Sequence, residues 1–218
     1  MINLPNVDLI IIDCIREHDA LEILEHCSNM INFGGLKLFT DKKVKSNFAE
    51  IIKIKEIYNL QEYSNFCLTL NDYIKNDFVL LIQRDGFIIN SHLWDDNFLC
   101  FDYIGAPWTN FGNYINDIGN GGFSLRSKYY LEYAASFKST NGQPEDYFLN
   151  EINFDKAKKF DINYPDLNIA LKFSVENFVP KIKNKLNLHN SFGFHGRHLI
   201  ETLKMQKPEL SQLLDRIN

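Results

Sequence analysis

The sequence lacks the features of a disulfide-rich or zinc-binding protein. Its four cysteines lie far apart and form no CxxC pair, which excludes a zinc knuckle and a thioredoxin motif. Three of them fall within apolar runs, so we expect buried, reduced thiols and hence a reducing, cytoplasmic compartment. The four are Cys14, Cys27, Cys67 and Cys100.

Long apolar runs and an excess of positive charge are also missing. The N-terminus has no basic region and only a short apolar run, so we expect no signal peptide in this segment. No run approaches the roughly 20 apolar residues of a membrane span, and we expect no membrane anchor in this chain. The formal net charge of -5 argues against a broad nucleic-acid footprint, although a local basic groove stays open.

Length and composition fit one globular domain. The chain has 218 residues, of which 45% are hydrophobic and 23% are charged. A chain of this length buries roughly 70% of its unfolded surface, so it needs no disulfide or metal for stability.

The first 86 residues alternate between strand and helix patterns. The run at 7–13, VDLIIID, is typical of a strand buried on both faces, and helical spacing follows at 17–30. Gly34 and Gly35 interrupt the chain before a second strand at 36–40, which predicts a parallel β-α-β unit. A strand at 49–56, a helix at 61–75 and a strand at 77–83 complete a nucleotide-binding layer.

The second half is richer in glycine and aromatic residues. We expect helices near 127–137 and from Pro144, a strand at 158–163, a loop over 184–196 and a short polar helix at 208–218. The segment 177–190 carries Lys181, Lys183 and Lys185. We expect it to be a solvated charged face, with an acceptor-side loop as the alternative.

Four groups of residues could carry chemistry. Asp85 follows a buried strand, where ligands bind in open α/β sheets, and its carboxylate could hold a divalent ion and a diphosphate. Asp146 could act as a general base, and His195 could bind an ion such as Mn²⁺. The glycines of GNGGFSLRS at 119–127 suggest a close backbone approach, although this segment is neither a Walker A loop nor GxGxxG. For each group the alternative is structural: a turn, a helix-dipole acid or a packed histidine.

Together these segments carry a resemblance. The string LLIQRDGFIIN, then DYIGAPW and GNGGFSLRS, and later PED and GFHG, resembles a family of small glycosyltransferase-like proteins catalogued as a domain of unknown function. The family resembles the GT-A fold, and the similarity spans roughly residues 5–200. It implies a single α/β domain with a mixed, mostly parallel sheet flanked by helices. Residues 1–86 would bind the nucleotide sugar, 87–200 would hold the acceptor and catalysis, and 201–218 would form a helical tail.

The resemblance also implies roles for particular residues. Asp146, with Glu145, corresponds to the catalytic carboxylates of inverting enzymes, and Asp85 and His195 to the ligands of Mn²⁺ or Mg²⁺. Gln83 stands where the general DxD motif has its first Asp. The nucleotide-sugar site would comprise Asp13, Arg16, Thr40, Asp41, Gln83, Arg84, Asp85, Gly86, Gly121, Gly122 and Arg126, and the acceptor or sugar pocket Trp108, Asn120, Phe123 and Ser124.

We therefore expect a cytoplasmic glycosyltransferase that moves a sugar from a nucleotide-diphosphate donor, UDP-linked by preference, to a hydroxyl acceptor. The acceptor could be a glycan, a protein, a small molecule or a modified DNA base. The alternative is a non-catalytic carbohydrate- or nucleotide-binding module, which Gln83 motivates. A nucleotidyltransferase is disfavoured because no glycine follows Asp13, and a glycosidase because nothing shows the carboxylate spacing of about 5–9 Å that it needs.

Overall fold

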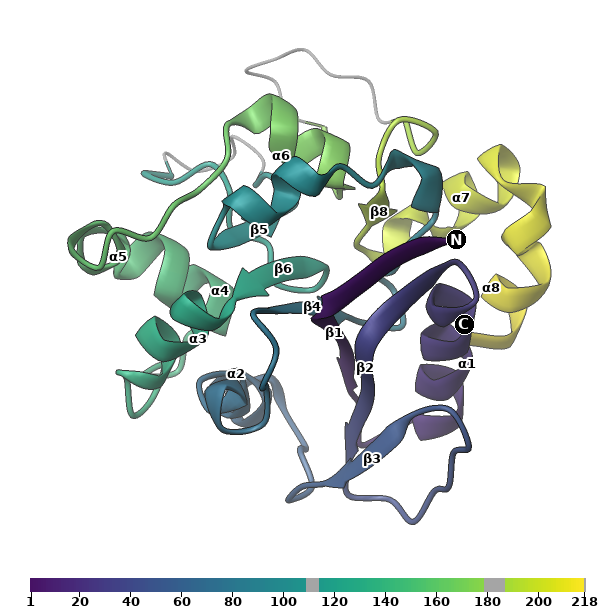
Figure 1. Ribbon diagram of the computed structural model, residues 1–218, viewed down its shortest axis with the longest axis horizontal. Coiled ribbons are helices and arrows are strands. Elements are labelled where there is room, and N and C mark those ends of the chain that lie inside the picture. Colours follow the sequence, from purple (N-terminus) through teal and green to yellow (C-terminus); the bar gives the residue numbers. More distant parts are fainter. Residues whose placement is uncertain (109–113, 179–186, 218) are drawn as a thin grey trace.

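A computed structural model describes residues 1–108, 114–178 and 187–217. Its core is a six-stranded sheet in the order β3-β2-β1-β4-β6-β5 (Figure 1). Strands β1 to β4 run parallel, and β6 runs antiparallel to both of its neighbours. This mixed, mostly parallel sheet confirms the predicted fold class. The strands are β1 (Ile2–Ile12), β2 (Ile31–Thr40), β3 (Glu50–Lys53), β4 (Phe78–Ile82), β5 (Tyr103–Gly105) and β6 (Ser124–Ser127).

The central strands are apolar on both faces because helices cover both sides of the sheet. Leu9 and Ile11 of β1 pack with α1 (Glu17–Ser28) on one face. Ile10 and Ile12 pack on the other face, with α2 (Leu60–Cys67) and α3 (Lys128–Ala135). Successive side chains of a strand point to opposite faces of the sheet, so a strand that is buried on both faces needs apolar residues at every position. The continuous apolar run therefore correctly predicted a strand covered on both faces.

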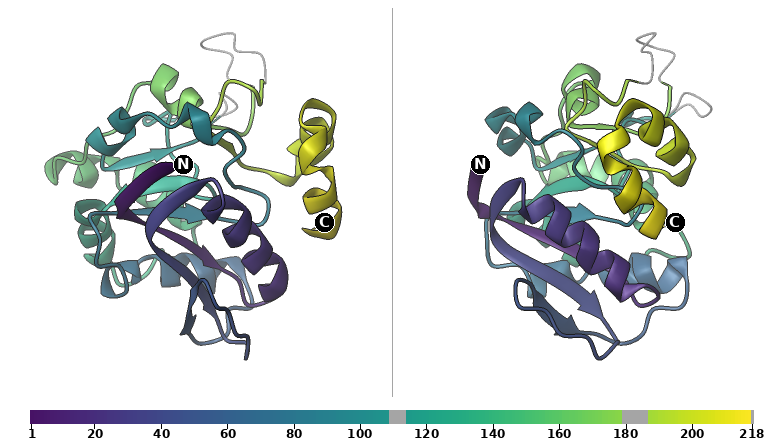
Figure 2. Two further views of the ribbon diagram at one scale, coloured as in Figure 1. Left: turned by 45° about the vertical axis from the view of Figure 1, so that its right-hand side comes forward. Right: turned by 90° about the vertical axis from the view of Figure 1, so that its right-hand side faces the viewer.

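The second half wraps around β5 and β6. After α3 come α4 (Glu145–Tyr147), a π-helical turn (Phe148–Ile152), α5 (Phe154–Lys159) and α6 (Leu167–Phe173). A small parallel sheet of β7 (Ser174–Val175) and β8 (Gly193–Phe194) then leads to α7 (Ile200–Gln206) and α8 (Ser211–Ile217). In the two views of Figure 2 the C-terminal helices lie beside α1.

The structure corrects several local predictions. Gly34 and Gly35 do not break the chain but lie inside β2. The strand expected at 158–163 is instead the end of α5 and a turn. The helix expected at 61–75 ends at Cys67, and a short 3-10 turn follows. Within the loop expected over 184–196, Gly193 and Phe194 form β8.

The predictions for the cysteines and for the C-terminal helix are confirmed in part. The thiols of Cys14, Cys27 and Cys67 are buried, whereas that of Cys100 is exposed, and all four are free. The helix expected at 208–218 is amphipathic rather than polar, since Leu213 and Leu214 are buried. Lys181, Lys183 and Lys185 lie outside the described residues.

Candidate active site

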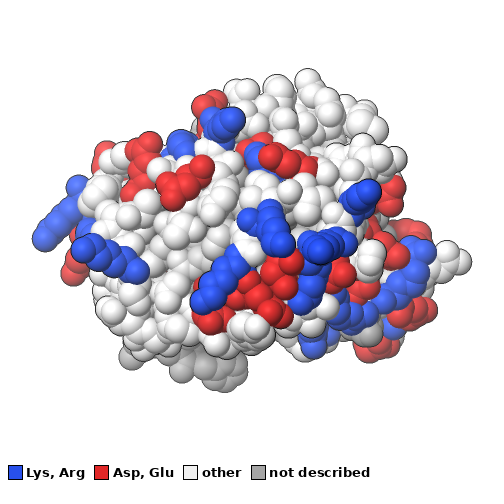
Figure 3. All heavy atoms as spheres, turned by 90° about the horizontal axis from the view of Figure 1, so that it is seen from below, with Lys and Arg blue, Asp and Glu red and all other residues white. Residues whose placement is uncertain are grey.

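The carboxyl ends of β1 and β4 meet at one edge of the sheet, as parallel neighbours must. Beside them lies a cavity of about 340 Å³. Its walls are mostly apolar and aromatic, with a few polar groups, the usual make-up of a small-molecule pocket. It is lined by Ile12, Asp13, Cys14, Ile15, Ile57, Tyr58, Asn59, Leu60, Tyr63 and Gln83. In Figure 3, which views the molecule from below, charges of both signs intermingle on the face towards which β1 and β2 run.

The turn that follows β4, residues 83–86, forms one side of the candidate site. Gln83 and Gly86 exchange backbone hydrogen bonds of 2.8 and 3.0 Å, which places Arg84 and Asp85 at the corner of a tight turn. The Gln83 side chain donates to the Tyr63 hydroxyl at 2.9 Å. The turn therefore joins the cavity wall to the remainder of the site.

His195 meets this turn although it lies 112 residues away. Its Nε2 is 3.2 Å from Gln83 Oε1. The ring packs directly on two glycines: a Cβ on Gly122 would come within 2.0 Å of Nε2, and one on Gly86 within 2.8 Å of Cδ2. Only glycine at both positions leaves room for the imidazole.

Glu176 fixes the orientation of that imidazole. Its Oε1 lies 3.0 Å from His195 Nδ1, and its Oε2 accepts a hydrogen bond of 3.0 Å from the Asn120 side chain. Burial alone would lower the pKa of His195, but the hydrogen bond and charge of Glu176 outweigh it, so the pKa is raised. The negative charges of Asp85 and Asp146 add to this rise.

Asp146 lies at the start of α4, half-buried and anchored to the glycine-rich segment. Its Oδ2 accepts a 3.0 Å hydrogen bond from the Gly121 N–H. Desolvation and then the charge of Glu145 raise its pKa to about 7, against the lowering effect of its backbone hydrogen bonds and Arg126. A carboxyl with a pKa near neutrality is suited to proton transfer.

Glu145 and Arg126 lie behind the site rather than in it. Arg126 is 1% exposed and bonds to Glu145 at 2.6 Å, with further donations to Ser124 Oγ and the Gly121 carbonyl. Phe123 and Ser124 are fully buried as well, so they present no surface to a ligand. These four residues support the site from within.

The remaining predicted residues divide into two groups. Asp13 belongs to the cavity, and its Oδ2 accepts a 2.6 Å hydrogen bond from Arg84. Thr40 is buried and Asp41 pairs with Lys42, so neither reaches the cavity lining. Arg16 turns away from the cavity towards the C-terminal helix.

Trp108 packs with two tyrosine rings, one of which directly follows Asp146 in the sequence. Its ring centroid is 5.0 Å from that of Tyr114 and 6.1 Å from that of Tyr147. Tyr147 is partly exposed and directly follows Asp146. The three rings form an aromatic cluster beside the candidate base.

Four residues of the site were missed by sequence reasoning: Tyr63, Tyr147, Glu176 and Arg197. Arg197 Nε lies 3.8 Å from Asp85 Oδ2. Tyr147 follows PED and Arg197 follows GFHG, so position next to a recognised segment was the only sequence signal for these two.

The side chains around Asp85 can be compared with the ligands that a divalent metal requires. Among the described residues, no three His, Cys, Asp or Glu side chains converge as a metal site. Asp85, His195 and the Gln83 amide oxygen are the available ligands. Mg²⁺ and similar ions are commonly held by one or two carboxylates plus substrate phosphates. By donor type, these residues could supply one carboxylate, one imidazole and one amide oxygen to an ion whose other ligands are phosphate oxygens.

Comparison with solved structures defines the class of fold. The structure is similar to the galactosyltransferase LgtC, solved in complex with donor and acceptor sugar analogues, with a TM-score of 0.52. The match covers 96% of this chain and 95% of that one, at 11% sequence identity. The chain thus has a GT-A-like fold.

By sequence, the chain belongs to the family described as "Protein of unknown function (DUF5672)", whose model matches residues 46–195. The bifunctional IspDF from Campylobacter jejuni gives a TM-score of 0.42 at 11% identity, over 73% of this chain and 55% of that one, too low to support any argument. No protein of curated function matches the sequence. Among the described residues, no helix is long and apolar enough to cross a bilayer.

Proposed function

We propose that this protein is a glycosyltransferase that uses a nucleoside-diphosphate sugar, UDP-linked by preference, and transfers the sugar to a hydroxyl acceptor with inversion. One observation carries the proposal. Gln83 lines the cavity and contacts His195, which packs on Gly122, and the neighbouring Gly121 N–H binds a half-buried Asp146 whose pKa is about 7. This chain of contacts supports a nucleoside pocket, a diphosphate site and a base arranged next to one another.

The cavity would take the nucleoside. Tyr58, Leu60 and Tyr63 offer apolar ring and side-chain surface, and Asp13 and Asn59 offer polar groups. The diphosphate would then lie over the turn at Arg84 and Asp85. Arg84, oriented by Asp13, and the exposed Arg197 would offset the charge that develops on the leaving diphosphate.

Asp85, His195 and Gln83 would hold Mn²⁺ or Mg²⁺ together with the donor oxygens. Such an ion would supply Lewis-acid stabilisation of the departing diphosphate. Glu176 would keep His195 Nδ1 engaged so that Nε2 stays directed at the site.

Asp146 would accept the proton of the acceptor hydroxyl. That oxygen forms a bond to the anomeric carbon while the bond from this carbon to the diphosphate oxygen breaks. The nucleoside diphosphate leaves with the bonding electron pair. The Gly121 N–H would hold the carboxylate in place during this step.

The aromatic cluster of Trp108, Tyr114 and Tyr147 would bind the acceptor beside Asp146. Aromatic rings with polar edges suit a sugar ring, which has an apolar face and a rim of hydroxyls. The carboxylates of Asp146, next to Tyr147, and of Glu151, which binds the N–H of Ile115 next to Tyr114, add polar groups near the rings and support a saccharide over a lipid chain as acceptor.

The four free cysteines support a reducing, cytoplasmic location.

A thermal-shift panel of UDP, GDP, CDP and dTDP, each with and without Mn²⁺, tests the donor site. A ligand at 100 times its Kd stabilises the fold by about 2.7 kcal/mol. We expect a metal-dependent shift with one diphosphate, followed by turnover of the matching nucleotide sugar. Binding without turnover against any acceptor would instead establish the non-catalytic module, and no shift with any nucleotide would contradict the proposal.

A further inference from the structure

Arg16 joins the start of the chain to its last helix. Its Nη1 donates to the Ile217 carbonyl at 3.0 Å, and its Nη2 donates to the Arg216 carbonyl at 3.2 Å. Its Nε pairs with Asp19. All three nitrogens of the guanidinium thus have partners within the protein. The two partners on α8 lie 201 and 200 residues away in the sequence.

The same short segment forms a wall of the cavity. Asp13, Cys14 and Ile15 line it, and Arg16 follows directly. Asp13 Oδ1 accepts the N–H groups of Ile15 and Arg16, both at 2.7 Å, which closes the segment into a turn. The Asp13–Arg16 turn therefore has the cavity on one side and α8 on the other.

Helix α8 is firmly docked where Arg16 meets it. Leu213, Leu214 and Ile217 are buried in the same core as the inward face of α1, and Arg216 reaches Glu22 of α1 at 3.1 Å. Figure 2 shows this helix alongside α1. The last carbonyls of a helix have no partner within it, so a guanidinium fork is well matched to them. A shift of α8 would therefore release Arg16.

We propose that α8 is a positioning element of the nucleotide cavity, acting through Arg16 on the Asp13–Arg16 turn. Arg16 is then a positioning residue and does not contact the nucleotide. The identity of the ligand, a nucleoside diphosphate, rests on the proposed function, whereas the coupling between α8 and the turn does not. Since Asp13 also orients Arg84, release of the turn would disturb the diphosphate end of the site as well.

A double-mutant cycle distinguishes positioning from direct contact. The variants are Arg16→Gln, a deletion of residues 211–218, and both together, and the readout is the Kd for UDP with Mn²⁺ by calorimetry. We expect each single change to weaken binding by at least about threefold, and the combined change to weaken it no further, as expected for coupled groups. Additive losses would mean that Arg16 and α8 act on the nucleotide site independently of each other, and either this result or unchanged Kd values would overturn the proposal.

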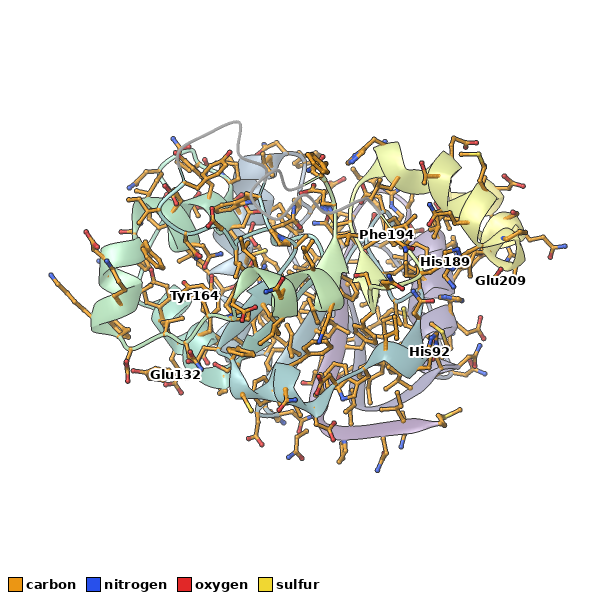
Figure 4. All side chains as sticks on the ribbon, turned by 90° about the horizontal axis from the view of Figure 1, so that it is seen from above. His92, Glu132, Tyr164, His189, Phe194 and Glu209 are labelled. Carbon is orange, nitrogen blue, oxygen red and sulfur yellow. The ribbon has the colours of Figure 1, made fainter. Side chains whose placement is uncertain are left out.

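A second measurement needs neither the deletion nor the nucleotide. In the nucleotide-free protein, amide hydrogen exchange at Ile15 and Arg16 reports on the turn. We expect faster exchange in Arg16→Gln and in Leu214→Ala, which loosens the docking of α8. Glu209→Gln, at the outer edge of the C-terminal helices (Figure 4), is the matched control and should leave exchange unchanged.

Unchanged exchange at Ile15 and Arg16 in both Arg16→Gln and Leu214→Ala would overturn the coupling. If the wild-type protein binds none of UDP, GDP, CDP or dTDP, the proposed function fails, yet the exchange experiment still decides whether α8 holds the turn.

Discussion

Arg126 and Glu145 form a buried ion pair, with 2.6 Å between Nη2 and Oε1, directly behind Asp146. The pair joins β6 to the start of α4, two segments that each carry part of the site. Arg126 also holds the carbonyl of Gly121, whose N–H binds Asp146. Arg126 and Glu145 were predicted to contact substrate, but in the structure they hold the segments that position Asp146.

Breaking this pair should destabilise the fold. Arg126→Met leaves the Glu145 carboxylate buried without its partner, and we expect a loss of about 3–5 kcal/mol in the free energy of unfolding. The apolar double variant Arg126→Met with Glu145→Leu removes both charges and should recover much of that loss. Urea denaturation of the wild type and the two variants measures this, and an Arg126→Met variant as stable as the wild type would contradict the expectation.

Asp146→Asn should abolish transfer and preserve donor binding. The amide keeps the size of the carboxyl but cannot accept the acceptor proton, and a general base contributes ~10²–10⁴-fold. The measurement is kcat for transfer beside the Kd for the nucleotide. Asp155→Asn, a carboxylate on the surface of α5, is the matched control. Transfer near the wild-type rate in Asp146→Asn would rule out this carboxylate as the base.

The rate should also depend on pH through Asp146. Its pKa of about 7 means that the base form is lost below neutrality. We expect kcat/KM to fall by about tenfold for each pH unit below that value. The sign for stability is opposite: ionisation of a carboxyl whose pKa is raised by folding is unfavourable, so this group's contribution to stability falls as pH rises from about 4 to about 7.

In Asp146→Asn that loss of stability between pH 4 and pH 7 should disappear. Thermal unfolding of the two proteins across this range checks the prediction independently of activity. A wild-type curve parallel to that of the variant would mean that the pKa of Asp146 is not raised in the folded state.

Asp85 should matter only when the metal and the diphosphate are present together. For Asp85→Ala we expect the Mn²⁺-dependent part of the thermal shift with UDP to decrease, since each tenfold loss in affinity removes about 1.4 kcal/mol of binding free energy. The shift without metal should be nearly unchanged. Asp95→Ala, a carboxylate remote from the turn that caps a short 3-10 helix, controls for the general effect of removing a charge.

Trp108 should act on the acceptor alone. Trp108→Ala removes the ring that packs against Tyr114 and Tyr147, and we expect the KM for a saccharide acceptor to rise by about threefold to tenfold. Hydrolysis of the donor in the absence of acceptor should be unaffected. Trp94→Phe is the control, because Trp94 packs on Phe98 and Phe192 within the fold. A rise in donor KM in place of acceptor KM would assign Trp108 to the donor side.

Local patterns predicted the first half of the fold well. The run ending at Asp13 and the helical spacing after it are local signals, and β1 and α1 form where these signals lie. Both strands begin earlier than predicted, β1 at Ile2 and β2 at Ile31, because pairing between them continues through Gly34 and Gly35.

The strand expected at 158–163 does not form: residues 158 and 159 end α5, and a turn follows in which Asp161 has a positive φ of 58°. There Ala157 is buried against the aromatic residues around α3, and α5 forms instead.

The sequence by itself determined the class of fold, the edge of the sheet where Gln83 and Asp85 lie, and the segments that approach it. These follow from periodicity and short motifs, which are local. Tertiary structure decided which side chains face the site. Burial of Arg126 with Glu145, the reach of Glu176 to His195 and the attachment of Arg16 to α8 all join residues distant in sequence. Such contacts depend on how helices and sheet pack together, and no local pattern records that packing.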